Sequence, residues 1–142
     1  MRIARALSDE IRDHALSGYP YEVCGVMLGR AEGGGARIEK VVRVTNREPE
    51  TPKIRYQIAP EDLIRIQREG REAGLEILGY YHSHPDHPAR PSETDRRIAA
   101  EGLSDGVIHV VVGVEAGREA TPKAWVFRDA TQGFDEEPFD VG

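Results

Sequence analysis

Residues 77–95 read Ile-Leu-Gly-Tyr-Tyr-His-Ser-His-Pro-Asp-His-Pro-Ala-Arg-Pro-Ser-Glu-Thr-Asp. The first part, residues 77–82, is rich in aliphatic and aromatic side chains and predicts a β-strand. Residues i and i+2 of an extended chain point to the same side, so His82 and His84 are expected to present two imidazoles on one face. Ser83 is expected to point away. Two nitrogen ligands for a metal ion would thereby lie side by side.

The second part of this stretch predicts the start of a helix over residues 93–101. Ser92 can serve as its N-cap in a capping box, with acidic residues in the first turn. Such a cap would hold Asp95 rigidly, and its carboxylate could turn toward the histidine pair. A zinc site of the catalytic type needs a third protein ligand and an open position, and a carboxylate meets the first need. The structural and the metal-binding interpretations of Asp95 can both hold.

The whole segment closely resembles the metal-binding signature of the JAMM (MPN+) zinc metalloprotease family. That signature is His-Ser/Thr-His, seven residues, Ser, two residues and Asp. Pro85–Pro91 supply the seven residues, and Ser92 and Asp95 follow at the required spacing. The family also has an upstream glutamate near a helix-to-strand transition, and Glu22 lies between the first expected helix and the first apolar strand.

The resemblance implies a role for each of these residues. His82, His84 and Asp95 would bind one Zn²⁺ per chain, Glu22 would be the general acid/base, and Ser92 would help to stabilise the oxyanion. The resemblance also implies a single-domain MPN/JAMM fold, which is similar to that of cytidine deaminases. As a compact prokaryotic member, the chain would hydrolyse the peptide or isopeptide bond after the C-terminal glycine of a ubiquitin-like or sulfur-carrier protein. The product released would be cysteine or a conjugated protein.

Patterns outside this stretch predict an α/β (α+β) fold with a mixed central β-sheet flanked by helices. Helices are expected at residues 7–17, 60–73 and 93–101, and strands at residues 23–28, 38–44, 54–58, 77–82, 107–114 and 123–127. Ser8 is the expected N-cap of the first helix, and Gly33–Gly35 the turn of a hairpin. In the second hairpin strand, the expected shared face carries Ile38, Lys40, Val42 and Val44. Residues 46–52 are expected to form a loop.

Length and composition limit the class of protein. The chain has 142 residues, which predicts one domain over residues 1–142. A net charge of -6 argues against nucleic acid or an anionic membrane as the main partner. The longest apolar run, Val107–Val114, falls far short of the roughly 20 residues of a membrane span. A single cysteine and the lack of a signal segment favour the cytoplasm.

Four other reactive side chains receive no catalytic role. His87 is expected to be exposed in a loop, and His14 to lie on the surface of the first helix. His109 is expected to be a hydrogen-bonded histidine in the core or at its rim. Cys24 has apolar neighbours and is expected to be a small buried side chain.

Two other functions remain as alternatives. A non-catalytic MPN scaffold would bind partners without metal, but it would lack ligands that are present here, and zinc stoichiometry would separate the two. A RadC-like protein normally has Asn between the two histidines, where this chain has Ser83. The sequence leaves open which carrier is cleaved, what group leaves and whether the chain forms a homodimer.

Overall fold

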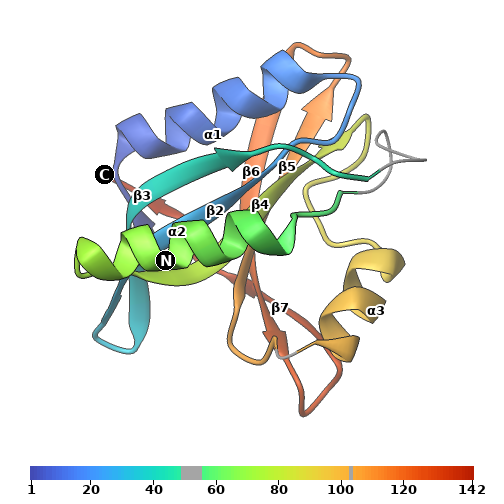
Figure 1. Cartoon of the computed structure of the whole chain (residues 1–142). Coiled ribbons are helices and arrows are strands. Elements are labelled where there is room, and N and C mark those ends of the chain that lie inside the picture. The colour runs from blue at the N-terminus through green and yellow to red at the C-terminus, as the bar shows by residue number, and fades with distance from the viewer. Residues whose placement is uncertain (49–55, 103) are drawn as a thin grey trace.

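The computed structural model describes residues 1–48, 56–102 and 104–142, and these form one eight-stranded mixed sheet with helices on both faces (Figure 1). The elements are β1 (Arg2–Ile3), α1 (Arg5–Gly18), β2 (Cys24–Glu32), β3 (Gly35–Val44), α2 (Pro60–Glu72), β4 (Glu76–Pro85), α3 (Glu93–Glu101), β5 (Ile108–Glu115), β6 (Glu119–Arg128), β7 (Gly133–Glu137) and β8 (Asp140–Val141). The strand order is β7-β6-β5-β4-β2-β3-β1-β8. Within the described ranges, the β1–β3, β1–β8 and β4–β5 pairs are parallel and the other strand pairs are antiparallel. The predicted fold class is therefore confirmed.

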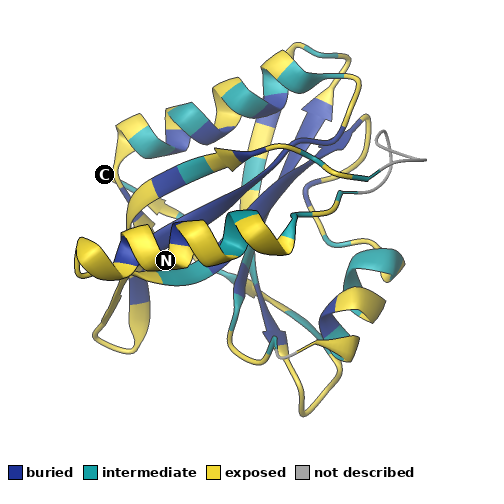
Figure 2. Ribbon diagram, in the orientation of Figure 1, coloured by how far each residue is buried: buried dark blue, intermediate teal, exposed yellow. Residues whose placement is uncertain are grey.

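Each face of the sheet has its own apolar core. Ile11 and Ala15 of α1 pack on one face, and Ile66 of α2 packs on the other, against Cys24 and Val26. Figure 2 shows the central strands as almost continuously buried between the two helices. Strands covered on both faces are expected to have continuous apolar runs, which explains the sequence of β5.

The helix boundaries follow the sequence prediction closely, except at the start of α1. The predicted helices over residues 60–73 and 93–101 are confirmed as α2 and α3. The prediction that Ser8 caps α1 is wrong, because the helix begins earlier and the N–H groups of Leu7 and Ser8 both donate to the carbonyl of Ala4. Ser8 is instead buried on the helix face that contains Ile11 and Ala15.

The β2–β3 hairpin is confirmed, but the predicted face of β3 is wrong. The register shifts after Leu28, which is opposite Lys40, so that one extra residue of β3 lies in the ladder. Such a β-bulge reverses the facing of the side chains beyond it. Ile38 therefore packs in the core beneath α1, whereas Val42 and Val44 pack in the core beneath α2.

The turn and loop predictions have mixed outcomes. Gly33 and Gly34 form the hairpin turn with φ of 53° and 82°, a left-handed conformation that favours glycine. The predicted strand at 54–58 is wrong over residues 56–58, which form no strand, and its first two residues lie outside the described part of the chain. The predicted loop at 46–52 is irregular over its described residues 46–48.

The other predicted strands are confirmed as β4 and β6, which are longer than predicted, and β5, which is shifted by one residue, whereas β1, β7 and β8 were not predicted. The very short β1 and β8 and the polar β7 lack an apolar run that would identify them. In the described residues, no helix is both long and apolar enough to cross a membrane.

Candidate metal centre

The C-terminal half of β4 brings two histidines together. His82 and His84 lie on the same face of the strand, and their Nε2 atoms are 3.1 Å apart. Ser83 lies on the opposite face, where its hydroxyl accepts a hydrogen bond of 2.9 Å from the backbone N–H of Val23. The predicted alternation of these side chains is confirmed, and it places two nitrogen donors at one buried point.

The first turn of α3 brings a carboxylate to the same point. The capping box is present: Ser92 Oγ accepts from the N–H of Asp95, and Asp95 Oδ2 accepts from the N–H of Ser92 at 2.8 Å. The same Oδ2 atom lies 3.2 Å from Nε2 of His82 and 3.2 Å from Nε2 of His84. Asp95 therefore has the structural role and also faces the histidine pair, as both interpretations require.

The spacing of these three donor atoms fits a tetrahedral metal ion. Zinc–ligand bonds of about 2.0–2.1 Å place neighbouring donors of a tetrahedron about 3.3–3.4 Å apart. The observed separations are 3.1, 3.2 and 3.2 Å, without any movement of the side chains. Two nitrogens and one oxygen on one side of an ion leave a fourth position open, which is the arrangement of catalytic zinc sites.

The charges of the three groups are strongly coupled. Burial lowers the pKa of His82 although the nearby Asp95 opposes this shift. The lowered pKa keeps a lone pair available on the His82 ring. Burial also acts on His84, but the hydrogen bond and charge of Asp95 outweigh it and raise the pKa of that ring. Burial opposes ionisation of Asp95, yet its hydrogen bonds with both imidazoles hold its pKa well below the ordinary range. A metal ion must therefore compete with a proton at this cluster.

The loop after β4 orients His84. Its Nδ1 lies 3.2 Å from the carbonyl oxygen of Pro88, and donation to that carbonyl leaves Nε2 as the free lone pair. The indole of Trp125 on β6 donates a hydrogen bond of 3.0 Å to the carbonyl of Ala89 and holds the loop on the sheet. Gly113 of β5 lies directly beneath, because a Cβ there would meet His87 O at 2.9 Å and Ala89 N at 3.0 Å.

Replacing Gly113 with alanine is expected to displace this loop, since the two atoms in contact belong to rigid backbone. We expect a stability loss of about 1–3 kcal/mol from overpacking, and roughly 10-fold weaker zinc affinity because the Pro88 carbonyl moves away from His84. Thermal unfolding and chelator competition measure the two effects. Gly35→Ala is the control, because its Cβ would meet only Glu32 O at an ordinary 3.6 Å. Unchanged zinc affinity in a destabilised Gly113→Ala protein would contradict the orienting role.

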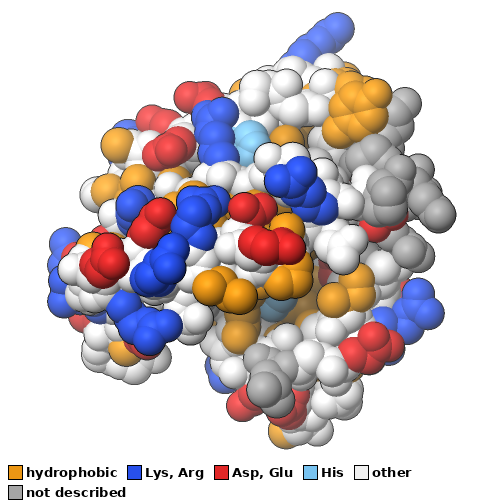
Figure 3. All heavy atoms as spheres, in the orientation of Figure 1, with side chains coloured by type: hydrophobic (Ala, Val, Ile, Leu, Met, Phe, Trp, Pro, Cys, Tyr) orange, Lys and Arg blue, Asp and Glu red, His pale blue; other side chains and the backbone are white. Residues whose placement is uncertain are grey.

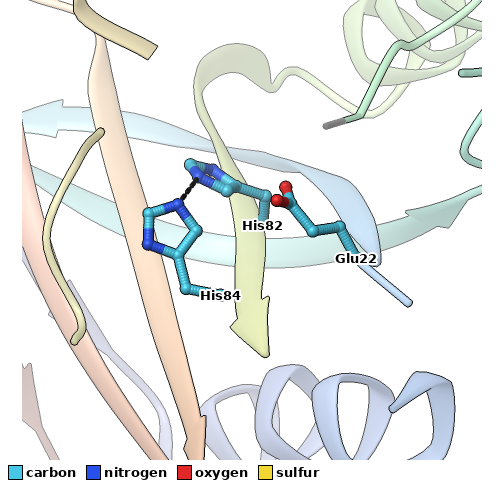
Figure 4. A group of neighbouring side chains, drawn as sticks. All are labelled: Glu22, His82 and His84. Carbon is cyan, nitrogen blue, oxygen red and sulfur yellow. Dashed lines mark hydrogen bonds between the residues drawn. The ribbon is translucent and has the colours of Figure 1, made fainter. Parts of the chain in front are cut away.

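Glu22 approaches the histidine pair from the segment between α1 and β2. It is 6% exposed, and one oxygen of its carboxylate lies within 4.8 Å of a nitrogen of each imidazole (Figure 4). Asp95 Oδ2 lies closer to both rings, at 3.2 Å, so the oxygen of Asp95 is the better third ligand. Burial raises the pKa of Glu22 to about 8, against the opposing effect of His84. A buried carboxyl beside a candidate metal site is suited to acid/base chemistry.

Tyr56 is a site residue that the sequence did not indicate. Its ring stacks on the imidazole of His82, with centroids 4.6 Å apart and an interplanar angle of 22°. No local pattern connects the two residues, because Tyr56 follows a long polar segment and contacts His82 only in the folded chain. The stack covers one face of the His82 ring.

The remaining histidines and the cysteine lie outside the cluster. His87 is exposed and Cys24 is fully buried, as predicted, and burial raises the pKa of the Cys24 thiol to about 12. His109 packs edge-on against Phe134 at the rim of the core, but its Nε2 has no hydrogen-bond partner in the described residues. The surface prediction for His14 is wrong: it is half-buried, and its Nδ1 lies 2.7 Å from the Tyr81 hydroxyl.

Two hollows, each of about 410 Å³, meet at the cluster of His82, His84 and Asp95, called the metal cluster below because these residues are the candidate metal ligands. The polar hollow is lined by Glu22, His84, His87, Pro88, Arg90, Pro91, Ser92 and Thr94. The apolar hollow is lined by Glu48, Tyr56, Gln57, Ile58, Leu63, Tyr80, Thr94, Asp95, Ile98, Ala99, Ser104 and His109. Figure 3 shows hydrophobic side chains gathered on the face between α2 and α3, where the apolar hollow lies. An extended substrate could therefore cross the cluster from one hollow to the other.

Residues 4–128 match the family described as prokaryotic homologues of the JAB domain. Desampylase of Haloferax volcanii is 33% identical over 104 residues, which are 70% of this chain and 73% of the relative. A probable TtuB-protein conjugate cleaving protease of Thermus thermophilus is 36% identical over 68% of this chain and 62% of its own length. CysO-cysteine peptidase of Mycobacterium tuberculosis is 33% identical over 62% of this chain and 58% of its own length.

Solved structures give the same picture of the fold. A protein of Desulfitobacterium hafniense superimposes with a TM-score of 0.84 at 26% identity, over 99% of this chain and 92% of that one. A JAB1/MPN domain protein of Archaeoglobus fulgidus, only 19% identical, superimposes with a TM-score of 0.61 over 100% of this chain and 96% of that one. The second likeness concerns the fold alone.

Proposed function

Because the chain belongs to the family of prokaryotic homologues of the JAB domain, we propose that it is a zinc-dependent peptidase or isopeptidase. Its proposed substrate is a ubiquitin-like or sulfur-carrier protein, and the bond cleaved follows the carrier's C-terminal glycine. The observation that carries this proposal is the convergence of His82 Nε2, His84 Nε2 and Asp95 Oδ2 beside the buried Glu22. The names of two relatives support the substrate class, since they describe cleavage of a TtuB–protein conjugate and of CysO-cysteine.

Each polar group of the site has a place in the proposed reaction. His82, His84 and Asp95 would hold one Zn²⁺, which would supply Lewis-acid polarisation of the scissile carbonyl and would acidify a water molecule. Glu22 takes a proton from the attacking water and delivers it to the leaving amine. The same carboxyl therefore acts first as general base and then as general acid. The Ser92 hydroxyl keeps its hydrogen free to donate toward the developing oxyanion, because its oxygen accepts from the N–H of Asp95.

The same donors argue against the scaffold alternative. A protein that only binds partners gains nothing from three ligating atoms held 3.1–3.2 Å apart, and burying the two histidines among them has a cost in stability. We also propose that residues 1–142 act as a single domain, since β1 and β8 pair with each other inside the same sheet.

Incubation with two substrates tests the proposed function. One is a carrier with an added C-terminal cysteine, and the other is the carrier joined to a lysine side chain. We expect cleavage of at least one of them after the carrier's terminal glycine, complete loss of cleavage with a chelator, and recovery on adding Zn²⁺. Mass spectrometry of the products identifies the bond. A folded protein that binds no zinc and cleaves neither substrate would favour the scaffold.

A further inference from the structure

The two hollows at the metal cluster differ in chemistry, and only one of them contains the proposed acid/base. Glu22 and His84 both line the polar hollow, whereas Asp95 and Tyr56 line the apolar hollow. A group that delivers a proton to the leaving amine must lie within hydrogen-bond reach of it. The leaving group therefore belongs in the polar hollow, and the carrier's tail in the apolar hollow.

A third hollow also reaches Glu22, but it does not meet the metal cluster. It is lined by His14, Arg43 and Asn46 among others, and by none of the three proposed metal ligands. The polar hollow, in contrast, is lined by both Glu22 and the proposed ligand His84. The polar hollow is the direct route.

Among the residues that the structure describes, Arg90 is the one arginine or lysine that lines the polar hollow. Its backbone is held, because its N–H donates to the carbonyl of Pro88 at 2.8 Å and the preceding Ala89 carbonyl is bound by Trp125. Its guanidinium forms no ion pair with any carboxylate in the described residues. An exposed arginine on a fixed loop thus offers an unused bidentate donor set to whatever occupies the hollow.

We infer that Arg90 is a specificity-determining residue that binds the free α-carboxylate of a single amino acid attached to the carrier. This inference rests on the proposed function. In such an adduct the carboxylate is attached to the same carbon as the scissile nitrogen, so it must lie in the polar hollow when that nitrogen is near Glu22. The negative charge of the adduct would meet the carboxyl of Glu22, and a guanidinium in the hollow offsets that repulsion.

A lysine side chain as the leaving group would gain nothing from Arg90. Its scissile nitrogen is followed by four methylene groups, with no carboxylate nearby for the guanidinium to bind. Arg90 therefore favours a released amino acid over a released lysine, because only the amino acid has a carboxylate next to the scissile nitrogen.

The decisive comparison uses two adducts of equal size. One carries a C-terminal cysteine with a free carboxylate, and the other carries the same cysteine as its carboxamide. We expect wild-type protein to prefer the acid by about 10-fold or more in kcat/KM, the size of one charge-assisted hydrogen bond. Arg90→Gln should remove this preference by raising KM for the acid alone, because the carboxylate is bound equally before and during reaction. Arg90→Lys should keep part of it.

Two controls make the result specific. Arg97→Gln removes an exposed arginine of α3 that lines none of the three hollows. It should leave kcat/KM unchanged for both the acid and the amide adduct. Arg43→Gln tests the third hollow, and loss of the preference in that variant instead of Arg90→Gln would overturn the assignment. Equal cleavage of acid and amide by wild-type protein would also overturn it, while leaving the proposed function intact. Cleavage of neither adduct, nor of a lysine conjugate, would instead contradict the proposed function.

Discussion

Asp95→Asn is expected to lose zinc while α3 keeps its first turn. Asn can still accept the hydrogen bond from the Ser92 N–H through its side-chain oxygen, so the cap survives. The metal cluster, however, loses its negative charge and its oxygen anion beside His82 and His84. We expect zinc affinity to fall by at least ~100-fold, the upper end of what even outer-shell partners contribute, and activity to fall with it.

Metal analysis after desalting and chelator competition measure this effect, and circular dichroism checks the fold. Glu93→Gln is the matched control, because Glu93 lies in the same turn of α3 and pairs with Arg96 at 2.6 Å instead of with the cluster. Zinc binding should be unchanged in that variant. If folded Asp95→Asn keeps zinc at wild-type affinity, the third ligand is a different residue, and Glu22 is then the leading candidate.

Glu22→Gln is expected to separate chemistry from metal binding. The amide has nearly the shape of the carboxyl and fits the same 6% exposed position, but it cannot accept and return a proton. We expect kcat to fall by roughly 10²–10⁴-fold, the usual contribution of a positioned acid/base. KM and zinc content should change little, because His82, His84 and Asp95 are intact.

Steady-state cleavage of a carrier adduct, with zinc content measured on the same preparation, gives both quantities. The pair of variants is informative together: Asp95→Asn should lose metal and activity, whereas Glu22→Gln should lose activity alone. Near-normal turnover in zinc-loaded Glu22→Gln would remove Glu22 from the mechanism. Loss of zinc from that variant would place the Glu22 carboxylate among the ligands.

Local features of the site could be predicted from short stretches of sequence. The alternation of His82, Ser83 and His84 needs only an extended backbone, and the Ser92–Asp95 cap needs only one helical turn. The same holds for the bounds of α2 and α3, whose start signals lie within a few residues of the helix ends. Glu22 was identified by resemblance to a family, because no local rule joins it to residues 82–95.

Other features depended on contacts between distant parts of the chain. The bulge after Leu28 sent Ile38 and Val42 to opposite faces, although the sequence of β3 alone suggests a shared face. The stacking of Tyr56 on His82 and the bond from Trp125 to Ala89 join elements that no short pattern connects. These positions follow from sheet register and from the need to bury two apolar faces at once.

The sequence by itself therefore determined which groups can ligate a metal and which backbone conformation presents each of them. Only the tertiary structure decided that His82, His84 and Asp95 converge to within 3.2 Å and that Glu22 lies beside them. It also decided that Arg90 lines the same polar hollow as Glu22 and His84. The reason is physical: side-chain alternation and helix caps are set by hydrogen bonds a few residues long, whereas the distance between two elements is set by how the whole sheet pairs and packs.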